Sequence, residues 1–252
     1  MKEQTIGQIE SNDIEVSKEH AQIIRKKKVL NKLYHDWYKF LLDRIDFLPD
    51  GKIIELGSGG GFIKDLNPNI ITTEVLDLDT VDMVFSAENM PFVSEELGAI
   101  FMIDVLHHIP KCRLFFKEAE RTLKPGGAII MSEPANTPWS RFFYQNFHRE
   151  DFDPSADWHL SDVTGPLSSA NGAIPWIVFN RDRAIFEKEY PELYVEEITL
   201  HTPLMYLLAG GLSPVSLIPP FGYSFFKLLE KSISPLNGFL AMFQLIIVRK
   251  RE

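Results

Sequence analysis

The sequence predicts an α/β fold built on a doubly wound, mostly parallel sheet. Two observations carry this prediction. Short apolar segments alternate with helical or turn segments between residues 52 and 133, and a glycine cluster directly follows the first apolar segment. The strands of a parallel sheet are nearly continuous apolar runs in the sequence, because helices cover both faces of the sheet. With 252 residues, 45% of them hydrophobic, the chain can bury one enlarged core.

Residues 1–48 are expected to form an N-terminal tail and a helix. Residues 1–17 are polar, and we expect them to be loosely ordered. Apolar side chains recur every three or four positions over residues 18–48, which predicts a helix. The repeating positions are Leu30, Tyr34, Trp37, Leu41 and Ile45. The basic run at 25–28 is expected to be a solvated helix face.

Residues 49–134 are expected to form the core of the sheet. Five strands are predicted, over residues 53–56, 70–76, 83–85, 99–103 and 127–132. A helix over about residues 111–123 separates the last two of them. The connection between the second and third strands is too short for a full helix.

The composition changes after Pro134. Residues 135–185 are rich in aromatic, Pro, Asn and Ser residues without clean periodicity. We therefore predict that residues 135–193 form a lid insertion after the fifth strand, which binds the acceptor, rather than another βα unit. Arg181 and Arg183 within it either form surface ion pairs or clamp an acidic ligand. Residues 194–252 are expected to complete the core, with strands over 194–201 and 241–248 around a helix at about 224–232.

Charge and cysteine content exclude several classes of protein. The net charge of −9 disfavours a general nucleic-acid binder, which needs a basic surface. Cys112 is the single cysteine, so an internal disulfide is excluded and a reducing, cytoplasmic location is expected. The chain has neither an apolar secretory signal nor an uninterrupted apolar stretch of about 18 residues, so no membrane span is expected.

The glycine-rich segment ELGSGGGF at residues 55–62 predicts a ligand-binding loop. Glycine permits positive φ angles and a close approach of the backbone to a ligand. Ligands of open parallel sheets bind outside the carboxyl ends of the strands. The loop alone is also compatible with a plain tight turn. A dinucleotide fingerprint would need a third small residue at position 62, where this chain has Phe62.

Four blocks together resemble the class I S-adenosylmethionine-dependent methyltransferases. They are the glycine loop at 55–61, AENMPF at 87–92, IDVLHHI at 103–109 and LKPGG at 123–127. Within that family the chain is similar to the small-molecule branch of ubiquinone and menaquinone C-methyltransferases. The resemblance implies a Rossmann-like sheet whose last strand is antiparallel, and S-adenosyl-L-methionine as the cofactor.

The resemblance also implies which residues hold the cofactor. The loop backbone would pack against the methionine portion, with an acidic side chain close to the ammonium group. The residues concerned are Glu55, Gly57, Ser58, Gly59 and Gly61.

An acidic residue at the end of the second strand would bind both ribose hydroxyls through its two oxygens. Glu74, Asp77 and Asp79 compete for this role, and the apparent end of the strand favours Glu74 or Asp77.

The adenine and the rest of the cofactor would contact residues of the next two blocks. Ala87 and Glu88 would flank the adenine, and Asp104 at the end of the fourth strand completes the expected cofactor set. Family members usually carry Asp at the position of Ser86, where its carboxylate accepts a hydrogen bond from the adenine amino group. This chain differs there. Either Ser86 or Glu88 would have to replace that contact.

His107 and His148 are the candidate catalytic residues. Methyl transfer from a sulfonium depends on alignment, and an oxygen acceptor must also lose a proton, for which histidine is the common base. The alternative for each histidine is a structural role. Histidines and carboxylates are also frequent over residues 148–162, including Asp162. They show no compact ligand spacing, so no metal site is expected.

The functional prediction is transfer of a methyl group to oxygen, carbon or nitrogen of a small molecule. The apolar and aromatic tail over 202–248 predicts a lipophilic or aromatic acceptor, reached at a membrane surface. Ser86 and the short connection keep a second hypothesis open, a catalytically silent S-adenosylmethionine-binding partner or sensor. Phe62 opposes a third, a nicotinamide-dependent oxidoreductase. The sequence selects no oligomeric state.

Overall fold

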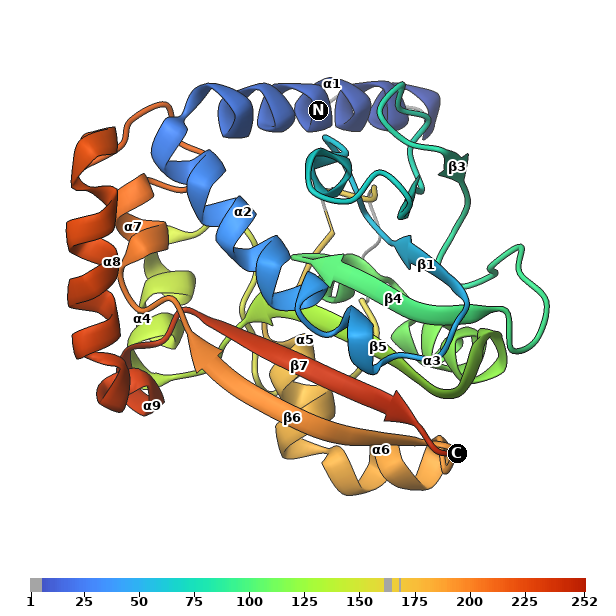
Figure 1. The fold of residues 1–252 in the computed structure, drawn as a ribbon. Coiled ribbons are helices and arrows are strands. Elements are labelled where there is room, and N and C mark those ends of the chain that lie inside the picture. The colour runs from blue at the N-terminus through green and yellow to red at the C-terminus, as the bar shows by residue number, and fades with distance from the viewer. Residues whose placement is uncertain (1–5, 161–164, 168) are drawn as a thin grey trace.

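A single mixed sheet organises the chain (Figure 1). The computed structural model describes residues 6–160, 165–167 and 169–252. Over these residues the sheet has seven strands in the order β3-β2-β1-β4-β5-β7-β6. Their bounds are β1 (Lys52–Glu55), β2 (Ile71–Glu74), β3 (Met83–Val84), β4 (Leu97–Ile103), β5 (Leu123–Pro134), β6 (Leu193–His201) and β7 (Phe243–Lys250).

The strand directions confirm the predicted fold class. β1 to β5 pair in parallel, whereas β7 is antiparallel to both of its neighbours, β5 and β6. The middle strands are apolar throughout because both of their faces are covered. Every residue of β4 is buried, and Ile100 pairs with Ile129 of β5.

Helices cover the sheet on both sides (Figure 1). Their bounds are α1 (Ile6–Lys26), α2 (Lys28–Leu42), α3 (Cys112–Thr122), α4 (Pro138–Phe147), α5 (Ile174–Trp176), α6 (Arg183–Glu189), α7 (Met205–Ala209), α8 (Tyr223–Ser232) and α9 (Asn237–Leu240). Among the described residues, no helix combines the length and the apolar character that crossing a membrane would require.

The N-terminal region differs from the prediction. Residues 6–17 are not loosely ordered but form the first half of α1, and residues 1–5 lie outside the described range. The predicted continuous helix is broken at Lys27, whose extended backbone separates α1 from α2. The Lys27 ammonium donates to the carbonyls of Gly211 (2.8 Å) and Ser213 (2.7 Å). The prediction of a solvated basic face is therefore wrong for Lys27, which fastens the helix junction to a distant loop.

The connections at the β1 end of the sheet are short. A 3-10 turn at Phe62–Asp65 follows the glycine loop, and the β2–β3 connection contains no helix in the structure, as the sequence predicted. α2 covers this region with an apolar face that includes Leu33 and Trp37, both fully buried. The Trp37 indole N–H donates to the Thr202 hydroxyl (3.0 Å), which ties α2 to the end of β6.

The expected lid insertion has two parts. α4 and the segment after it lie at the carboxyl end of β5, where Tyr144 and Phe152 contribute to a cavity. The second part is helical: α5, a π-helix at Ile177–Arg181 and α6 lead into β6. Since β5 and β6 are each antiparallel to β7, they run parallel to each other, and this half acts as a crossover. The prediction that no βα unit occurs here is therefore wrong for the second half.

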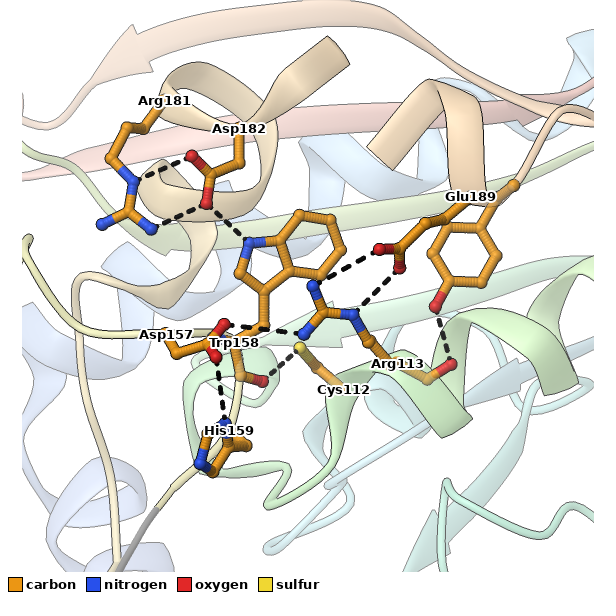
Figure 2. Close-up of polar contacts among 9 residues, drawn as sticks. Cys112, Arg113, Asp157, Trp158, His159, Arg181, Asp182 and Glu189 are labelled. Carbon is orange, nitrogen blue, oxygen red and sulfur yellow. Dashed lines mark hydrogen bonds and ion pairs between the residues drawn. The ribbon is translucent and has the colours of Figure 1, made fainter. Parts of the chain in front are cut away.

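A polar network joins the insertion to α3 (Figure 2). The Cys112 thiol donates to the Trp158 carbonyl (2.9 Å), and the Arg113 guanidinium lies over the Trp158 ring. The Trp158 indole N–H donates to Asp182 (2.8 Å), which also pairs with Arg181 (2.7 Å). The structure thus agrees with the ion-pair interpretation of Arg181, and it buries the Cys112 thiol.

Candidate functional site

A cavity of about 230 Å³ lies at the carboxyl edge of the sheet. Its walls come from the glycine loop after β1, from Glu74 at the end of β2, from Asp104 after β4 and from Pro134 at the end of β5. α1 contributes Ser17 and His20 to the opposite side. The cavity therefore occupies the position at which open parallel sheets bind ligands.

The glycine loop adopts a conformation that only glycine tolerates well. Gly57, Gly59 and Gly61 have φ angles of +64°, +48° and +64°. A Cβ on Gly61 would lie 2.7 Å from the Thr80 carbonyl oxygen, whereas a Cβ on Gly59 would meet only the Ser17 hydroxyl, at 3.9 Å. The backbone at Gly59 is thus bare toward the cavity, as the sequence predicted.

Glu55 lies beneath this loop and is almost completely buried. Among the described residues its Oε2 atom has no hydrogen-bond partner. Burial raises the pKa of Glu55 to about 7, against the opposing effect of hydrogen bonds from Ser58 and Tyr38. Tyr38 and Ser58 line the cavity, although Glu55 itself does not. An orphaned buried carboxyl oxygen beside a bare backbone fits a ligand that carries an ammonium group.

Of the three acidic candidates for the ribose, only Glu74 lines the cavity. Its Oε2 accepts the Gly59 N–H (3.2 Å) and its Oε1 accepts the Val75 N–H (2.8 Å). Burial raises the pKa of Glu74. Asp77 and Asp79 are exposed on the connection that follows.

The residues expected around the adenine do not line the cavity. Ala87 is half-buried against the core. Glu88 accepts the Lys111 backbone N–H (2.9 Å), and the exposed Ser86 accepts the Glu88 N–H (3.2 Å). The side-chain oxygens of Ser86 and Glu88 thus accept hydrogen bonds from backbone N–H groups.

Asp104 lines the cavity in an unusual backbone conformation. Its φ angle of +57° places a residue other than glycine in the left-handed region. Such strain persists where the surrounding structure imposes it, often at functional sites. Here the Asp104 N–H is held by the Ser132 carbonyl (2.9 Å). Burial raises the pKa of Asp104 to about 8, and the charge of His107 opposes this shift.

His107 is held by Glu133, at the end of β5. Its Nδ1 lies 2.7 Å from the Glu133 Oε2, and the other Glu133 oxygen accepts the N–H groups of Val105 (2.9 Å) and Leu106 (2.7 Å). Burial lowers the pKa of His107, but the carboxylates of Glu133 and Glu150 on its two sides raise it well above its usual value.

Glu150 brings the histidines together. Its carboxylate lies 3.4 Å from His107 Nε2, 3.7 Å from His108 Nε2 and 3.8 Å from His148 Nδ1. These histidines lower the pKa of Glu150 to about 2, although burial acts in the opposite direction. The structure therefore places both predicted catalytic histidines, His107 and His148, in one cluster on the cavity wall.

Sequence reasoning missed the centre of this cluster. Glu150 stood out only as one acidic residue among several in the insertion. Glu133, at the end of a predicted strand, was compatible both with lining the pocket and with simply ending the strand. His20 of α1, which also lines the cavity, lies in the predicted helix, but nothing in the local sequence indicated that this helix would reach the site. Aromatic side chains also line the cavity: Tyr34, Tyr38, Phe62, Tyr144, Phe152, Tyr206 and Phe243.

Comparison with known proteins supports a methyltransferase fold. Residues 55–131 match the family model described as "Methyltransferase domain". A curated relative, an uncharacterized 37.1 kDa protein in transposon TN4556 of Streptomyces fradiae, is 31% identical over 117 residues. That match covers 37% of this chain and 33% of the relative, so the chain spans about a third of that protein's length.

Two solved structures illustrate the similarity of the fold. Geranyl diphosphate C-methyltransferase from Streptomyces coelicolor A3(2), in complex with Mg²⁺, geranyl diphosphate and S-adenosyl-L-homocysteine, superposes with a TM-score of 0.55 at 16% identity, covering 88% of this chain and 82% of that one. A geranyl diphosphate methyltransferase in complex with SAM gives 0.53 at 14% identity, covering 92% and 90%. Residues 55–131 are therefore similar to a methyltransferase domain, and the chain shares the Rossmann-like α/β fold of these methyltransferase structures.

Proposed function

We propose that this protein is an S-adenosylmethionine-dependent methyltransferase that acts on a small lipophilic or aromatic molecule. The observation that carries the proposal is the unpaired Glu55 oxygen beneath a loop of three glycines with positive φ. A buried carboxyl group with an unpaired oxygen beside a bare backbone fits the ammonium at the amino acid end of S-adenosylmethionine. The bound cofactor supplies an activated methyl group on its sulfonium.

The residues of this chain divide into a cofactor wall and an acceptor wall. On the cofactor wall, Gly57 and Gly59 admit the methionine portion, and Glu74 offers carboxylate oxygens to the ribose. Asp77 is exposed and away from the cavity, so Glu74 is our choice for the ribose. Ala87 and Glu88 remain proposed adenine contacts, although both lie outside the cavity lining.

The acceptor wall carries the histidine cluster, and we assign His107 and His148 to the acceptor. Glu133 fixes the ring of His107, so this side chain meets a bound acceptor in one orientation. A fixed wall serves the alignment of acceptor and methyl group that displacement requires. The proposed lid reaches the cavity through residues 144–152, which include His148, and through Leu167 and Gly172.

Two features favour a lipophilic acceptor. The cavity lining is rich in aromatic side chains, which bind apolar molecules. In addition, α8 exposes Phe225, Leu228 and Leu229 on one helix face, with 66%, 66% and 41% of each residue accessible. A membrane surface that holds the acceptor would cover such a face. A cytoplasmic location accords with the buried, reduced Cys112.

Calorimetry with the purified protein tests the cofactor, and transfer of a labelled methyl group from S-adenosylmethionine to lipid extracts tests the reaction. We expect binding of S-adenosylmethionine and S-adenosylhomocysteine, and labelled product in the extract. His107→Asn and His148→Asn should lose product formation while keeping cofactor affinity, and the exposed His159→Asn is the matched control. Absence of cofactor binding would refute the proposal, and binding without transfer to any extract would instead favour a silent binder.

A further inference from the structure

Two histidines and one carboxylate converge at the cavity wall with the spacing of a coordination sphere. Nitrogen atoms of His107 and His108 and an oxygen of Glu150 all lie within 4.8 Å of one another. His107 Nε2 is 3.4 Å from the Glu150 carboxylate, and His108 Nε2 is 3.7 Å from it. Neighbouring ligands of a tetrahedral zinc ion, each about 2.1 Å from the metal, are separated by about 3.4 Å.

The far side of each imidazole ring is already fixed. His107 Nδ1 is 2.7 Å from the Glu133 carboxylate, and His108 Nδ1 is 3.2 Å from the Ser169 carbonyl oxygen. Both contacts leave the Nε2 atoms directed toward Glu150. Metal-binding histidines are commonly held this way, with one ring nitrogen on the metal and the other on a carboxylate or a carbonyl.

We propose that His107, His108 and Glu150 bind a divalent transition-metal ion of the zinc type at the cavity wall. Two imidazole nitrogens with one carboxylate select Zn²⁺, Co²⁺ or Fe²⁺ over Mg²⁺ and Ca²⁺, which prefer oxygen ligands. Three protein ligands leave a coordination position open toward the cavity. That position would receive water or an electron-rich atom of the acceptor.

The neighbouring histidine helps to define the ligand set. His148 Nδ1 lies 3.8 Å from Glu150, but the same nitrogen accepts the Glu150 backbone N–H at 3.3 Å. His148 therefore lies beside the site rather than in it. The ligands come from two segments, the 3-10 turn at Leu106–His108 after β4 and the loop after α4, which are more than 40 residues apart in the chain. This separation explains why their spacing in the sequence gave no metal motif.

Metal binding can be tested without the reaction. The full-length protein is stripped with a chelator, dialysed and titrated with Co²⁺, whose visible absorption reports coordination by nitrogen, and then with Zn²⁺ as a competitor. We expect saturation at one ion per chain, displacement by Zn²⁺ and no displacement by an equal concentration of Mg²⁺. A spectrum that stays that of aqueous Co²⁺, or equal displacement by Mg²⁺, would overturn the proposal.

The Co²⁺ affinity of substituted proteins tests whether these residues form the metal site. His108→Ala and Glu150→Gln should each weaken Co²⁺ affinity by at least about 10-fold. His159→Ala, an exposed histidine of the same insertion, should leave it unchanged. Glu150, whose side chain is 34% accessible, provides a readout if His108→Ala does not fold. Wild-type affinity in folded Glu150→Gln would refute the site. Calorimetry with S-adenosylhomocysteine on the same sample tests the proposed function separately, because the metal site could exist without cofactor binding.

Discussion

Glu74 and Asp77 lie close together in the sequence, but only the first reaches the cavity. Glu74 accepts backbone N–H groups of Gly59 and Val75, which hold its carboxylate beside the glycine loop. Asp77 is exposed on the connection that follows β2. One residue is therefore placed to bind a ligand, and the other is a control of the same charge.

Glu74→Gln is expected to weaken S-adenosylhomocysteine binding by about 10- to 100-fold. A carboxylate that accepts hydroxyl hydrogen bonds contributes about 1.5–3 kcal/mol, and glutamine keeps only part of this. Asp77→Asn should bind like the wild type. Isothermal titration of the three proteins at one salt concentration measures the effect. Equal losses in both variants would point to net charge instead of a specific contact.

Glu55 predicts a pH dependence of stability. The pKa of its carboxyl is about 7 in the folded state, compared with an ordinary value of 4.5. Between these two values the folded state keeps a proton that the unfolded chain has lost, so the free energy of unfolding falls as the pH rises. The fall attributable to Glu55 is about 3 kcal/mol across this window. It should be complete once the pH exceeds the folded-state pKa.

The Glu55→Gln variant isolates this contribution. Its amide does not titrate, so the difference in unfolding free energy between variant and wild type should shift in favour of the variant as the pH rises from 4.5 to 7. Urea denaturation of the cofactor-free protein at several pH values measures that difference. If the unfolding free energies of the two proteins changed with pH in the same way, the shifted pKa of Glu55 would be contradicted. Cofactor binding by the wild type near pH 7 should also release protons, measurable as a buffer-dependent binding enthalpy.

At the scale of elements, the glycine loop combines positive φ angles with steric constraint on its backbone. Gly61 combines a positive φ with a close approach to the Thr80 carbonyl, whereas Gly126 has a φ of +76° and open space around its Cα. The two glycines therefore separate the cost of backbone conformation from the cost of steric contact.

Gly126→Ala is expected to lower the free energy of unfolding by about 1–2 kcal/mol, the cost of a left-handed alanine. Gly61→Ala should lose more, because its Cβ would lie 2.7 Å from a backbone oxygen that cannot rotate away. Thermal and urea denaturation of both variants test the order. A Gly61→Ala protein as stable as Gly126→Ala would mean that the loop relaxes without penalty.

At the scale of the whole molecule, α8 lies at the outer edge of the fold, beyond α7 (Figure 1), and its apolar side chains are exposed. Phe225 and Leu228 are each 66% accessible, and their burial in a bilayer interface would contribute about 1.5–3 kcal/mol per side chain. The double variant Phe225→Ser/Leu228→Ser should therefore lose at least about 10-fold in vesicle affinity.

Sedimentation with phosphatidylcholine vesicles, with and without anionic phosphatidylglycerol, measures this binding. Val93→Ser is the control, since Val93 is 70% accessible in the β3–β4 connection. A wild-type protein that stays in the supernatant with every vesicle would exclude a membrane role for α8. Equal losses in the Val93 variant would show that general hydrophobicity, not this face, drives binding.

The strand pattern was predictable because it depends on local sequence. A buried parallel strand must be apolar along its length, as β4 is, and a strand followed by ELGSGGGF must turn sharply. The N-terminal half of α1 was not predicted because it is polar, and a polar segment without apolar periodicity is typical of disorder. The helical second half of the insertion was missed because Ile174, Ile177 and Phe179 are buried on several sides, which removes the amphipathic period.

The sequence by itself determined the α/β sheet, the bare glycine loop and the short connections, since each follows from residues that are neighbours in the chain. Only the tertiary structure decided which acidic residue reaches the cavity and that Lys27 holds a helix junction. It also decided that Glu150 gathers three histidines from two segments. These contacts join residues far apart in the sequence, and no local pattern encodes a distance set by the packing of the whole chain.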